Sequence, residues 1–278
     1  MVIRRRPGTL TGMNLAQELA ALVVPVACPG CAQPDIKLCR KCARWLAGPL
    51  RRVEAQVPRL DDLSGRPIMP VWALGSYEGS IRGQVVAWKD KGREDLTKPF
   101  TAALVTQIAP VAQNAPPEAP QPQYGFRLQR TKTPRPARTA TVKGITGEAA
   151  PGFPGKIAVV MPMPSSAKSQ RERGRAQLAP IAKAVAAQFG VDARWLLHKS
   201  GTTDQVGLSA RARGQTKITV SRRQAQKLPA GASVLLLDDV VTTGATLAAA
   251  RDALQRAGFS VVGALVLAAT PAPRAIPT

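Results

Sequence analysis

Short hydrophobic runs in this chain alternate with longer segments of helical character. The runs 234–237 and 260–268 are too short to cross a membrane, and their largely apolar character is typical of strands buried on both faces. Segments 178–189 and 247–257 are rich in helix-forming residues, and Gly258 follows the second at the position of a C-terminal cap. This alternation predicts an α/β fold with a parallel sheet flanked by helices and joined by right-handed crossovers.

The N-terminal half continues the same pattern. Residues 15–23 are expected to form a short amphipathic helix, and residues 45–62 a short helix with a connector. Residues 68–75 are expected to form a strand, followed by helices at 77–92 and 96–112. These elements precede a clear change in composition.

The chain changes character between residues 113 and 156. This stretch is rich in proline and in cations, contains few acids and lacks apolar periodicity, so it is predicted to be a disordered or extended insertion. Its positive charge suits non-specific contact with nucleic acid, although a linker without any binding role fits equally well. The chain therefore divides into a helix and cysteine module in 1–62, a first part of the main domain in 63–112, the insertion in 113–156, and the core of the main domain in 157–278.

The net charge of the chain is strongly positive. Lys and Arg total 39 against 17 Asp and Glu, a formal charge of +22 at pH 7. Such a surplus favours polyanionic partners, either nucleic acid or phosphorylated small molecules, although a general basic bias explains it equally well. Aromatic residues make up only 4% of the chain, so a surface for stacking bases is poorly supplied.

The N-terminal segment has some features of a secretory signal, because three arginines at 4–6 precede an apolar stretch. Gln17 and Glu18 interrupt that stretch, and Pro25 stands just before the position of cleavage, which argues against a signal. No run reaches the length of a transmembrane helix. We therefore expect a soluble, cytoplasmic protein without membrane insertion.

The segment 233–246 carries the most specific chemical pattern. Its strand ends at two carboxylates, Asp238 and Asp239, and a tight loop then opens the helix 247–257. A loop that leads into a helix N-terminus presents unpaired N–H groups and the positive end of the helix dipole, which together bind anions. The loop is small and rich in hydroxyl groups, and consists of Thr242, Thr243, Gly244, Ala245 and Thr246.

The order of acids, hydroxyls and glycine indicates which anion is bound. Gly244 allows the backbone to approach a phosphate closely, and the threonine hydroxyls add donors. Asp238 and Asp239 would repel a phosphate, but they can accept hydrogen bonds from sugar hydroxyls or help to hold a hydrated Mg²⁺. The pattern therefore predicts a phosphorylated ribose ligand with Mg²⁺. The alternative is a strand that ends in two solvated acids before an ordinary capped helix.

All four cysteines lie close together, as two Cys-x-x-Cys pairs. The pairs are Cys28 with Cys31 and Cys39 with Cys42. Two such pairs offer four thiolates to a tetrahedral Zn²⁺, and the site is expected to be structural because protein ligands fill all four positions. The alternative, two disulfides, suits a small secreted domain better than a chain whose main motif binds a cytosolic metabolite.

A second candidate contact with the ligand lies at the end of the strand expected at 156–164. Met163 and Pro164 end that strand, and a cation-rich loop at 165–175, which includes Arg173, comes after them. Loops beyond the carboxyl ends of strands are where open α/β sheets bind ligands. We therefore expect this loop to face the acidic pair.

Four further residues are candidate phosphate or lid contacts. Lys89 and Arg93 belong to a basic helix face, which is either solvated or in contact with phosphate or nucleic acid. Residues 201–215, with Gln205 and Arg211, are expected to form a mobile loop or lid.

Taken together, these segments resemble the ComF (ComFC/GntX-like) family of phosphoribosyltransferase-related proteins over nearly the whole chain except 113–156. The stretch 233–246 resembles the phosphoribosyl pyrophosphate (PRPP) signature of type I phosphoribosyltransferases. In one segment the chain departs from the family, which has Arg-Gly-Phe-Asn-Gln where this chain has Arg173-Gly-Arg-Ala-Gln177. The matching features are the four cysteines, Tyr77-Glu-Gly with Arg82, Lys89-x-Lys-Gly-Arg93, Met161-Pro-Met-Pro164, Gln205-Val-Gly-Leu-Ser209 and the signature itself.

The resemblance implies a type I phosphoribosyltransferase fold, zinc in the N-terminal module and a link to DNA uptake during competence. As an enzyme, the chain would bind Mg²⁺–PRPP with its 5′-phosphate at 242–246, its ribose on Asp238 and Asp239, and its pyrophosphate near Met163, Pro164 and nearby cations. A nucleophile would then displace pyrophosphate, with catalysis by positioning and charge stabilisation.

The competing hypothesis is a non-catalytic protein that senses PRPP, or a scaffold that binds single-stranded DNA or a competence partner. The intact acidic pair favours the enzyme. The changed segment 173–177 and the positive charge favour the scaffold.

Overall fold

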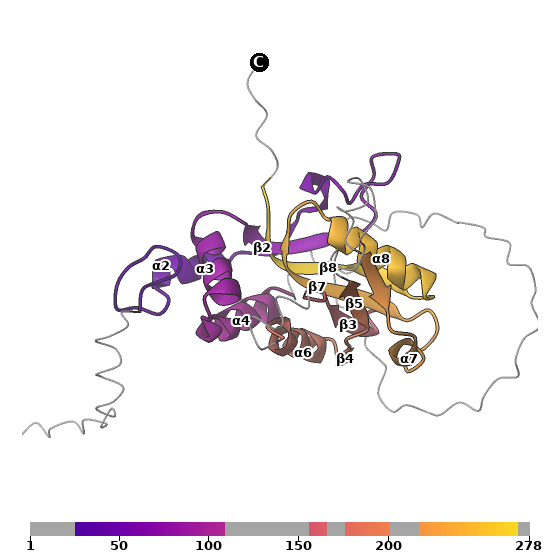
Figure 1. Cartoon of the computed structure of the whole chain (residues 1–278). Helices are drawn as coiled ribbons and strands as arrows, with labels where there is room; N and C mark the ends of the chain where they lie inside the picture. Colours follow the sequence, from indigo (N-terminus) through magenta and orange to yellow (C-terminus); the bar gives the residue numbers. More distant parts are fainter. Residues whose placement is uncertain (1–25, 109–155, 166–175, 201–216, 272–278) are drawn as a thin grey trace, which may run out of the picture.

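A computed structural model describes residues 26–108, 156–165, 176–200 and 217–271. At their centre lies a sheet with the strand order β1-β2-β8-β7-β3-β4 (Figure 1). All neighbouring pairs are parallel except β1 with β2. The predicted α/β fold with a mainly parallel sheet is therefore confirmed. The strands are β1 (Arg51–Arg52), β2 (Val71–Ser76), β3 (Val159–Pro162), β4 (Asp192–Ala193), β7 (Ser233–Val241) and β8 (Ser260–Ala269).

Two hydrophobic cores lie on the two faces of this sheet. Leu235 and Leu237 of β7 are buried in the core that also contains the apolar faces of α3 (Gly79–Asp90), α4 (Thr97–Ile108) and α6 (Leu178–Gln188). Val234 and Leu236 are buried in the other core, with α8 (Ala245–Arg256) and the antiparallel pair β5 (Leu197–Ser200) and β6 (Lys217–Val220), which leads into α7 (Arg222–Ala225). Because alternate residues of a strand face opposite sides, β7 must be apolar at every position between the two cores.

The parallel strands end at one edge of the sheet. Ser76 at the end of β2 pairs with Ala269 at the end of β8, and Ala269 pairs with Val241 at the end of β7. On the other side of β7, Pro162 at the end of β3 pairs with Leu237. The loops that follow β7 and β3 therefore emerge side by side, at the edge where parallel sheets bind their ligands.

The cysteine module, defined here as residues 26–46, packs beside α3 (Figure 1). It includes α2 (Arg40–Ala43) and the 3-10 turn η1 (Arg44–Leu46). A Cβ atom at Gly83 of α3 would overlap the carbonyl oxygen of Pro29, so this approach requires glycine. The fully buried Gln84 donates from Nε2 to the carbonyl of Cys42 at 3.2 Å. The module is thus anchored directly to α3.

The segment 45–62 differs from its prediction as a short helix with a connector. It contains η1, the two-residue strand β1, the 3-10 turn η2 (Glu54–Gln56) and turns. Val53, Val57 and Leu60 are buried in the same core as α8, so long-range packing overrides the local helical preference.

Other expected elements are found where the sequence indicates them. The strand expected at 68–75 is β2, and the helices expected at 77–92 and 96–112 are α3 and α4, the second ending at Ile108. The helix expected at 15–23, the loop 201–215 and the insertion 113–156, apart from its final lysine, lie outside the described residues. Among the helices that the structure describes, none combines the length and apolar character needed to span a bilayer.

Candidate functional site

The turn between β7 and α8 requires glycine at one position. Gly244 is the N-cap of α8 and has a φ of +79°. A Cβ atom there would lie 2.6 Å from both Leu60 Cγ and Val57 Cγ1. The backbone N–H of Arg59 also donates to the carbonyl of Thr243 at 2.9 Å. The segment before β2 therefore supports the turn on one side, and Gly244 is needed for this packing.

The start of α8 is open to an anion. Thr242 and Thr243 are exposed, and Gly244 supplies no side chain to cap the helix. The N–H of Ala245 lies 3.4 Å from Thr243 Oγ1, a long and therefore weak hydrogen bond. Since α8 is 12 residues long, its first turn carries the positive end of a full helix dipole. The predicted phosphate loop 242–246 thus combines exposed hydroxyl groups with the N-terminal end of α8.

The two acids at the end of β7 have different surroundings. Asp238 Oδ1 accepts the N–H of Asp239 at 2.9 Å. Burial, together with the adjacent charge of Asp239, raises the pKa of Asp238 to about 7. Asp239 Oδ1 accepts the N–H of Val240 at 2.7 Å, and Asp239 Oδ2 lies 2.6 Å from Lys89 Nζ. Asp238 therefore takes up a proton near neutral pH, whereas Asp239 is paired with the ammonium group of Lys89.

Residues from two other elements reach the same edge. The N–H of Met163 donates to the carbonyl of Leu237 at 2.8 Å, which puts Met163 and Pro164 beside the start of the acidic pair. Lys89 arrives from the last turn of α3. The structure therefore brings together the predicted residues from β7, from the loop after it, from the end of β3 and from α3.

Arg93 has different neighbours. Its guanidinium donates to the carbonyls of Ala27 at 2.9 Å and Lys37 at 2.7 Å, and two of its N–H groups donate to Asp95 at 2.8 Å. Arg93 thus joins the cysteine module to the segment after α3, and its contact with phosphate stays a prediction. The remaining candidates, Arg173, Gln205 and Arg211, lie outside the described residues.

One residue of this edge was not singled out from the sequence. Gln177, just before α6, donates from Nε2 to the carbonyl of Trp88 at 2.7 Å and to that of Lys89 at 3.0 Å. It therefore joins the start of α6 to the end of α3. The only signal for Gln177 in the sequence is its position at the end of the segment 173–177, where the chain differs from the family that it resembles.

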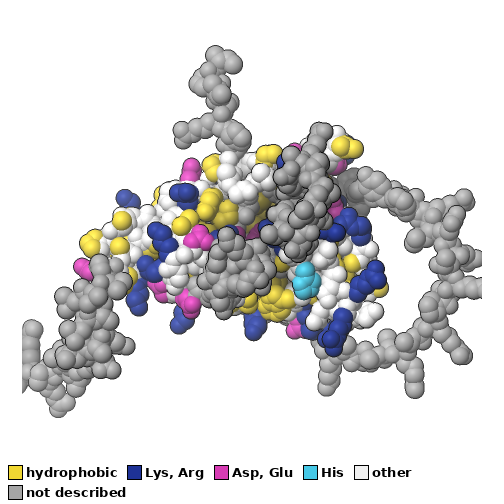
Figure 2. All heavy atoms as spheres, viewed as in Figure 1, with side chains coloured by type: hydrophobic (Ala, Val, Ile, Leu, Met, Phe, Trp, Pro, Cys, Tyr) yellow, Lys and Arg dark blue, Asp and Glu magenta, His cyan; other side chains and the backbone are white. Residues whose placement is uncertain are grey.

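Charged side chains are mixed on the face of the molecule that Figure 2 shows. Lys and Arg side chains lie on both flanks, with acidic side chains among them, rather than in one basic patch. The described part of this face therefore does not have the continuous basic stripe typical of a nucleic-acid surface.

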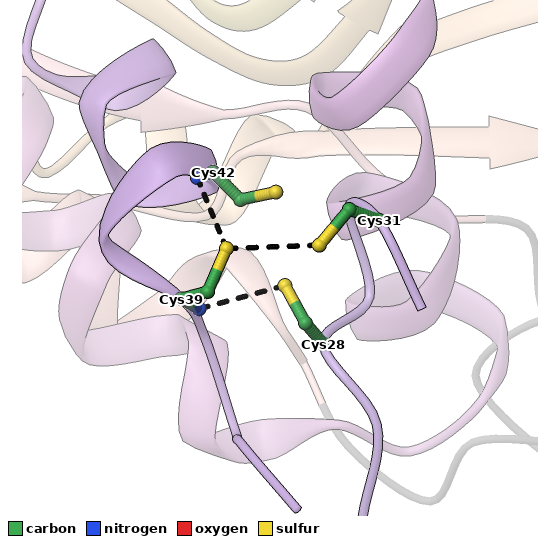
Figure 3. A group of neighbouring side chains, drawn as sticks. All are labelled: Cys28, Cys31, Cys39 and Cys42. Carbon is green, nitrogen blue, oxygen red and sulfur yellow. Dashed lines mark hydrogen bonds between the residues drawn. The ribbon is translucent and has the colours of Figure 1, made fainter. Parts of the chain in front are cut away.

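The four cysteines form a compact cluster in which the sulfur atoms face one another (Figure 3). All four ligand atoms lie within 4.8 Å of each other, and Cys31 Sγ is 3.6 Å from Cys39 Sγ. Around a tetrahedral zinc with Zn–S bonds of about 2.3 Å, neighbouring sulfur atoms are expected to lie roughly 3.8 Å apart. None of the four cysteines forms a disulfide in this structure, unlike in the two-disulfide alternative.

The protonation of the cluster also fits a cation. Burial disfavours the Cys28 thiolate, but backbone N–H groups that point to its sulfur, including that of Cys39 at 3.5 Å, lower the pKa of Cys28 to about 6. Burial and the neighbouring sulfur atoms raise the pKa of Cys42 to about 12. A positive charge beside the cluster would favour the ionised form of Cys42, and Zn²⁺ supplies such a charge. The donor set could hold zinc.

Comparison with known proteins gives matches to phosphoribosyltransferases. Residues 179–277 match the family described as the phosphoribosyl transferase domain. A curated relative, the adenine phosphoribosyltransferase of Polynucleobacter asymbioticus, is 54% identical over 44 residues. That match spans 16% of this chain and about a quarter, 26%, of the relative.

Two solved structures have a distant overall likeness. The adenine phosphoribosyltransferase of Leishmania tarentolae is 10% identical, with 65% of this chain and 75% of that chain covered and a TM-score of 0.33. The enzyme of Trypanosoma brucei, in complex with AMP, pyrophosphate and ribose-5-phosphate, is 11% identical, with 80% and 87% covered and a TM-score of 0.36.

Proposed function

We propose that this chain binds PRPP with Mg²⁺ at the edge formed by β7, α8 and β3, and that it transfers the phosphoribosyl group to an acceptor. The observation that carries the proposal is the order of an acidic pair, a glycine turn and an uncapped helix start at the end of a buried parallel strand. The match of residues 179–277 to the phosphoribosyl transferase domain includes this whole segment and supports the proposal.

In this proposal the 5′-phosphate binds to the loop 242–246. Its donors are the N–H groups of the first turn of α8 and the hydroxyl groups of Thr242, Thr243 and Thr246. The contact of Gly244 with Leu60 fixes the shape of the loop in advance, so little conformational freedom is lost when a ligand binds.

The ribose hydroxyl groups bind to Asp238 and Asp239. Asp239, paired with Lys89, accepts hydrogen bonds, whereas Asp238, with a pKa of about 7, can either donate or accept. The pyrophosphate then faces Met163 and Pro164, with cations from Lys89 and Arg173 beside it. Gln205 and Arg211 remain our candidates for a lid over the ligand.

Transfer requires the bond between the anomeric carbon and a pyrophosphate oxygen to break while a bond to the acceptor forms. The carbon becomes cationic as the leaving group becomes more negative, so catalysis depends on cations near the pyrophosphate and on the position of the ribose. The two carboxylates are the groups of this site that would hold the hydration shell of a bound Mg²⁺, which would neutralise part of the pyrophosphate charge.

The cysteine module is proposed to hold a structural Zn²⁺ through Cys28, Cys31, Cys39 and Cys42. A four-cysteine module next to a phosphoribosyltransferase-like core is among the features that the chain shares with the ComF family that it resembles. We propose that the chain is a ComF-family protein, with a link to competence and a cytoplasmic location.

A second candidate is a non-catalytic protein that senses PRPP. The segment 173–177 favours it, because the chain has Arg175 and Ala176 where the family that it resembles has Phe and Asn. Gln177, which matches the family, donates hydrogen bonds to the carbonyls of Trp88 and Lys89 at the end of α3, so it has a structural role that does not require catalysis.

Calorimetric titration with PRPP, with and without Mg²⁺, followed by an assay of pyrophosphate release with each nucleobase, tests the proposal. Binding that depends on Mg²⁺, together with pyrophosphate release, supports the enzyme. Tight binding without release from any nucleobase favours the sensor, and absence of PRPP binding rejects both.

A further inference from the structure

The end of α3 is fixed against its surroundings from two sides. Gln177 donates to the carbonyls of Trp88 and Lys89, as described above. Trp88 Nε1 donates to Thr97 Oγ1 at 2.9 Å, and the Trp88 ring packs edge-on against Phe100 at 5.4 Å. The backbone of Lys89 therefore has a defined position, and only its long side chain is free to reorient.

Lys89 lies between the acidic pair and the start of α6. Its ammonium group is 2.6 Å from Asp239 Oδ2, and its carbonyl accepts from Gln177, which ends the cation-rich loop that begins after Pro164. The side chain of Lys89 is 32% exposed and that of Asp239 is 16% exposed. This is a half-buried ion pair, which is strong enough to be ordered and accessible enough to exchange its partner.

The ion pair occupies a carboxylate oxygen that the ribose is proposed to use. The other oxygen of Asp239 already accepts the N–H of Val240. A sugar hydroxyl that binds Asp239 Oδ2 must therefore share this oxygen with Lys89 or displace Lys89 from it. A pyrophosphate group carries more charge than one carboxylate and is proposed to face Met163 and Pro164, which lie beside the start of the acidic pair, so it offers Lys89 a stronger partner near the same side chain.

We propose that Lys89 is a specificity-determining residue that exchanges partners. Without a pyrophosphate group its ammonium remains on Asp239 and opposes ribose binding. With PRPP it moves to the pyrophosphate and releases Asp239 to the sugar. The site thereby distinguishes PRPP from ribose-5-phosphate, which has the same 5′-phosphate but no pyrophosphate. This inference rests on the proposed PRPP site.

The two ligands make the inference testable because they are expected to respond differently. In Lys89→Ala, PRPP affinity measured by calorimetry with Mg²⁺ should fall about 10- to 100-fold, the loss expected for a contact between charged groups. Ribose-5-phosphate affinity should stay the same or rise a few-fold, since Asp239 is no longer occupied. The dissociation constant of ribose-5-phosphate divided by that of PRPP should therefore fall by at least about 10-fold.

Matched variants separate this effect from general damage. Lys91→Ala removes an exposed cation just beyond the same helix and should leave the ratio as in the wild type. Lys89→Gln keeps most of the side-chain length without the charge and should reproduce the result of Lys89→Ala, even if the alanine variant folds poorly.

The outcomes distinguish failure of the proposed PRPP site from failure of the partner exchange at Lys89. If the wild type binds neither ligand, the proposed function fails and this inference fails with it. If the wild type binds both but Lys89→Gln weakens both by the same factor, or neither, the exchange is refuted while the PRPP site stands.

Discussion

A Cβ atom at Gly244 would lie 2.6 Å from Leu60 Cγ, so the turn that opens α8 touches a segment that comes long before it in the sequence. The same turn has the positive φ that glycine adopts without strain. Packing and backbone geometry therefore both require glycine at this position.

Gly244→Ala should accordingly destabilise the protein more than an alanine at another glycine with positive φ. We expect a loss of about 2–4 kcal/mol, from backbone strain of roughly 1–2 kcal/mol and overpacking of similar size. Gly258→Ala is the matched control, because Gly258 has a φ of +85° but nothing within 4 Å of its Cβ position. Equal losses for the two variants in urea unfolding would contradict the proposed packing.

The cysteine module should carry close to one zinc per chain, as measured by elemental analysis of purified protein. Cys39→Ser should lower both the zinc content and the melting temperature, because metal binding is coupled to folding. Lys41→Ala, at an exposed position within the same Cys-x-x-Cys pair, should change neither. Full zinc content in a variant that lacks both Cys39 and Cys42 would exclude the site.

The stability of the ligand-free protein should fall as the pH rises from about 4 to about 7. The pKa of Asp238 is raised from 3.8 to about 7 in the folded protein, so folding favours the protonated carboxyl group. Its contribution is present below the unfolded pKa and is lost as the pH passes the folded pKa.

Asp238→Asn should remove this pH dependence. At roughly 1.4 kcal/mol per pH unit over that window, the variant should be more stable than the wild type at pH 8 by at most about 4 kcal/mol. Asp252→Asn, at an exposed site on α8, controls for the loss of one carboxylate. Parallel pH profiles of the wild type and Asp238→Asn in urea unfolding would show that Asp238 is not the group responsible.

Local sequence patterns predicted the central part of the fold and of the site. The apolar run of β7, its two acids, the glycine turn and α8 are consecutive in the chain, so periodicity and capping rules apply to them directly. The cysteine spacing likewise predicted a four-sulfur cluster, because both pairs lie within one short segment.

Contacts between segments distant in the sequence could not be predicted from local patterns. The sequence identified Lys89 only as one cation on a basic helix face, and nothing local indicates that it meets Asp239. Arg93, from the same motif, instead holds the cysteine module. Which cation faces which partner depends on how α3 packs on the sheet, and that packing is decided by the whole core.

The segment 45–62 was predicted incorrectly for the same reason. Its helical preference is weak compared with the burial of Val53, Val57 and Leu60 against α8 and its neighbours. A rule based on local propensity cannot include that gain, because many of the partners, those in β7 and α8 among them, lie more than a hundred residues further along the chain.

The central claim is that the segment 238–246 binds the phosphoribosyl group of PRPP. It is tested most directly by calorimetric titration of the wild type, Asp239→Asn and Thr243→Val with PRPP and Mg²⁺, with Thr219→Val of β6 as the control. Asp239→Asn should weaken binding by on the order of 1.5–3 kcal/mol, the range for a hydrogen bond to a charged group. Thr243→Val should weaken the binding of ribose-5-phosphate as well, because it acts on the 5′-phosphate. Unchanged PRPP affinity in both variants would contradict the claim.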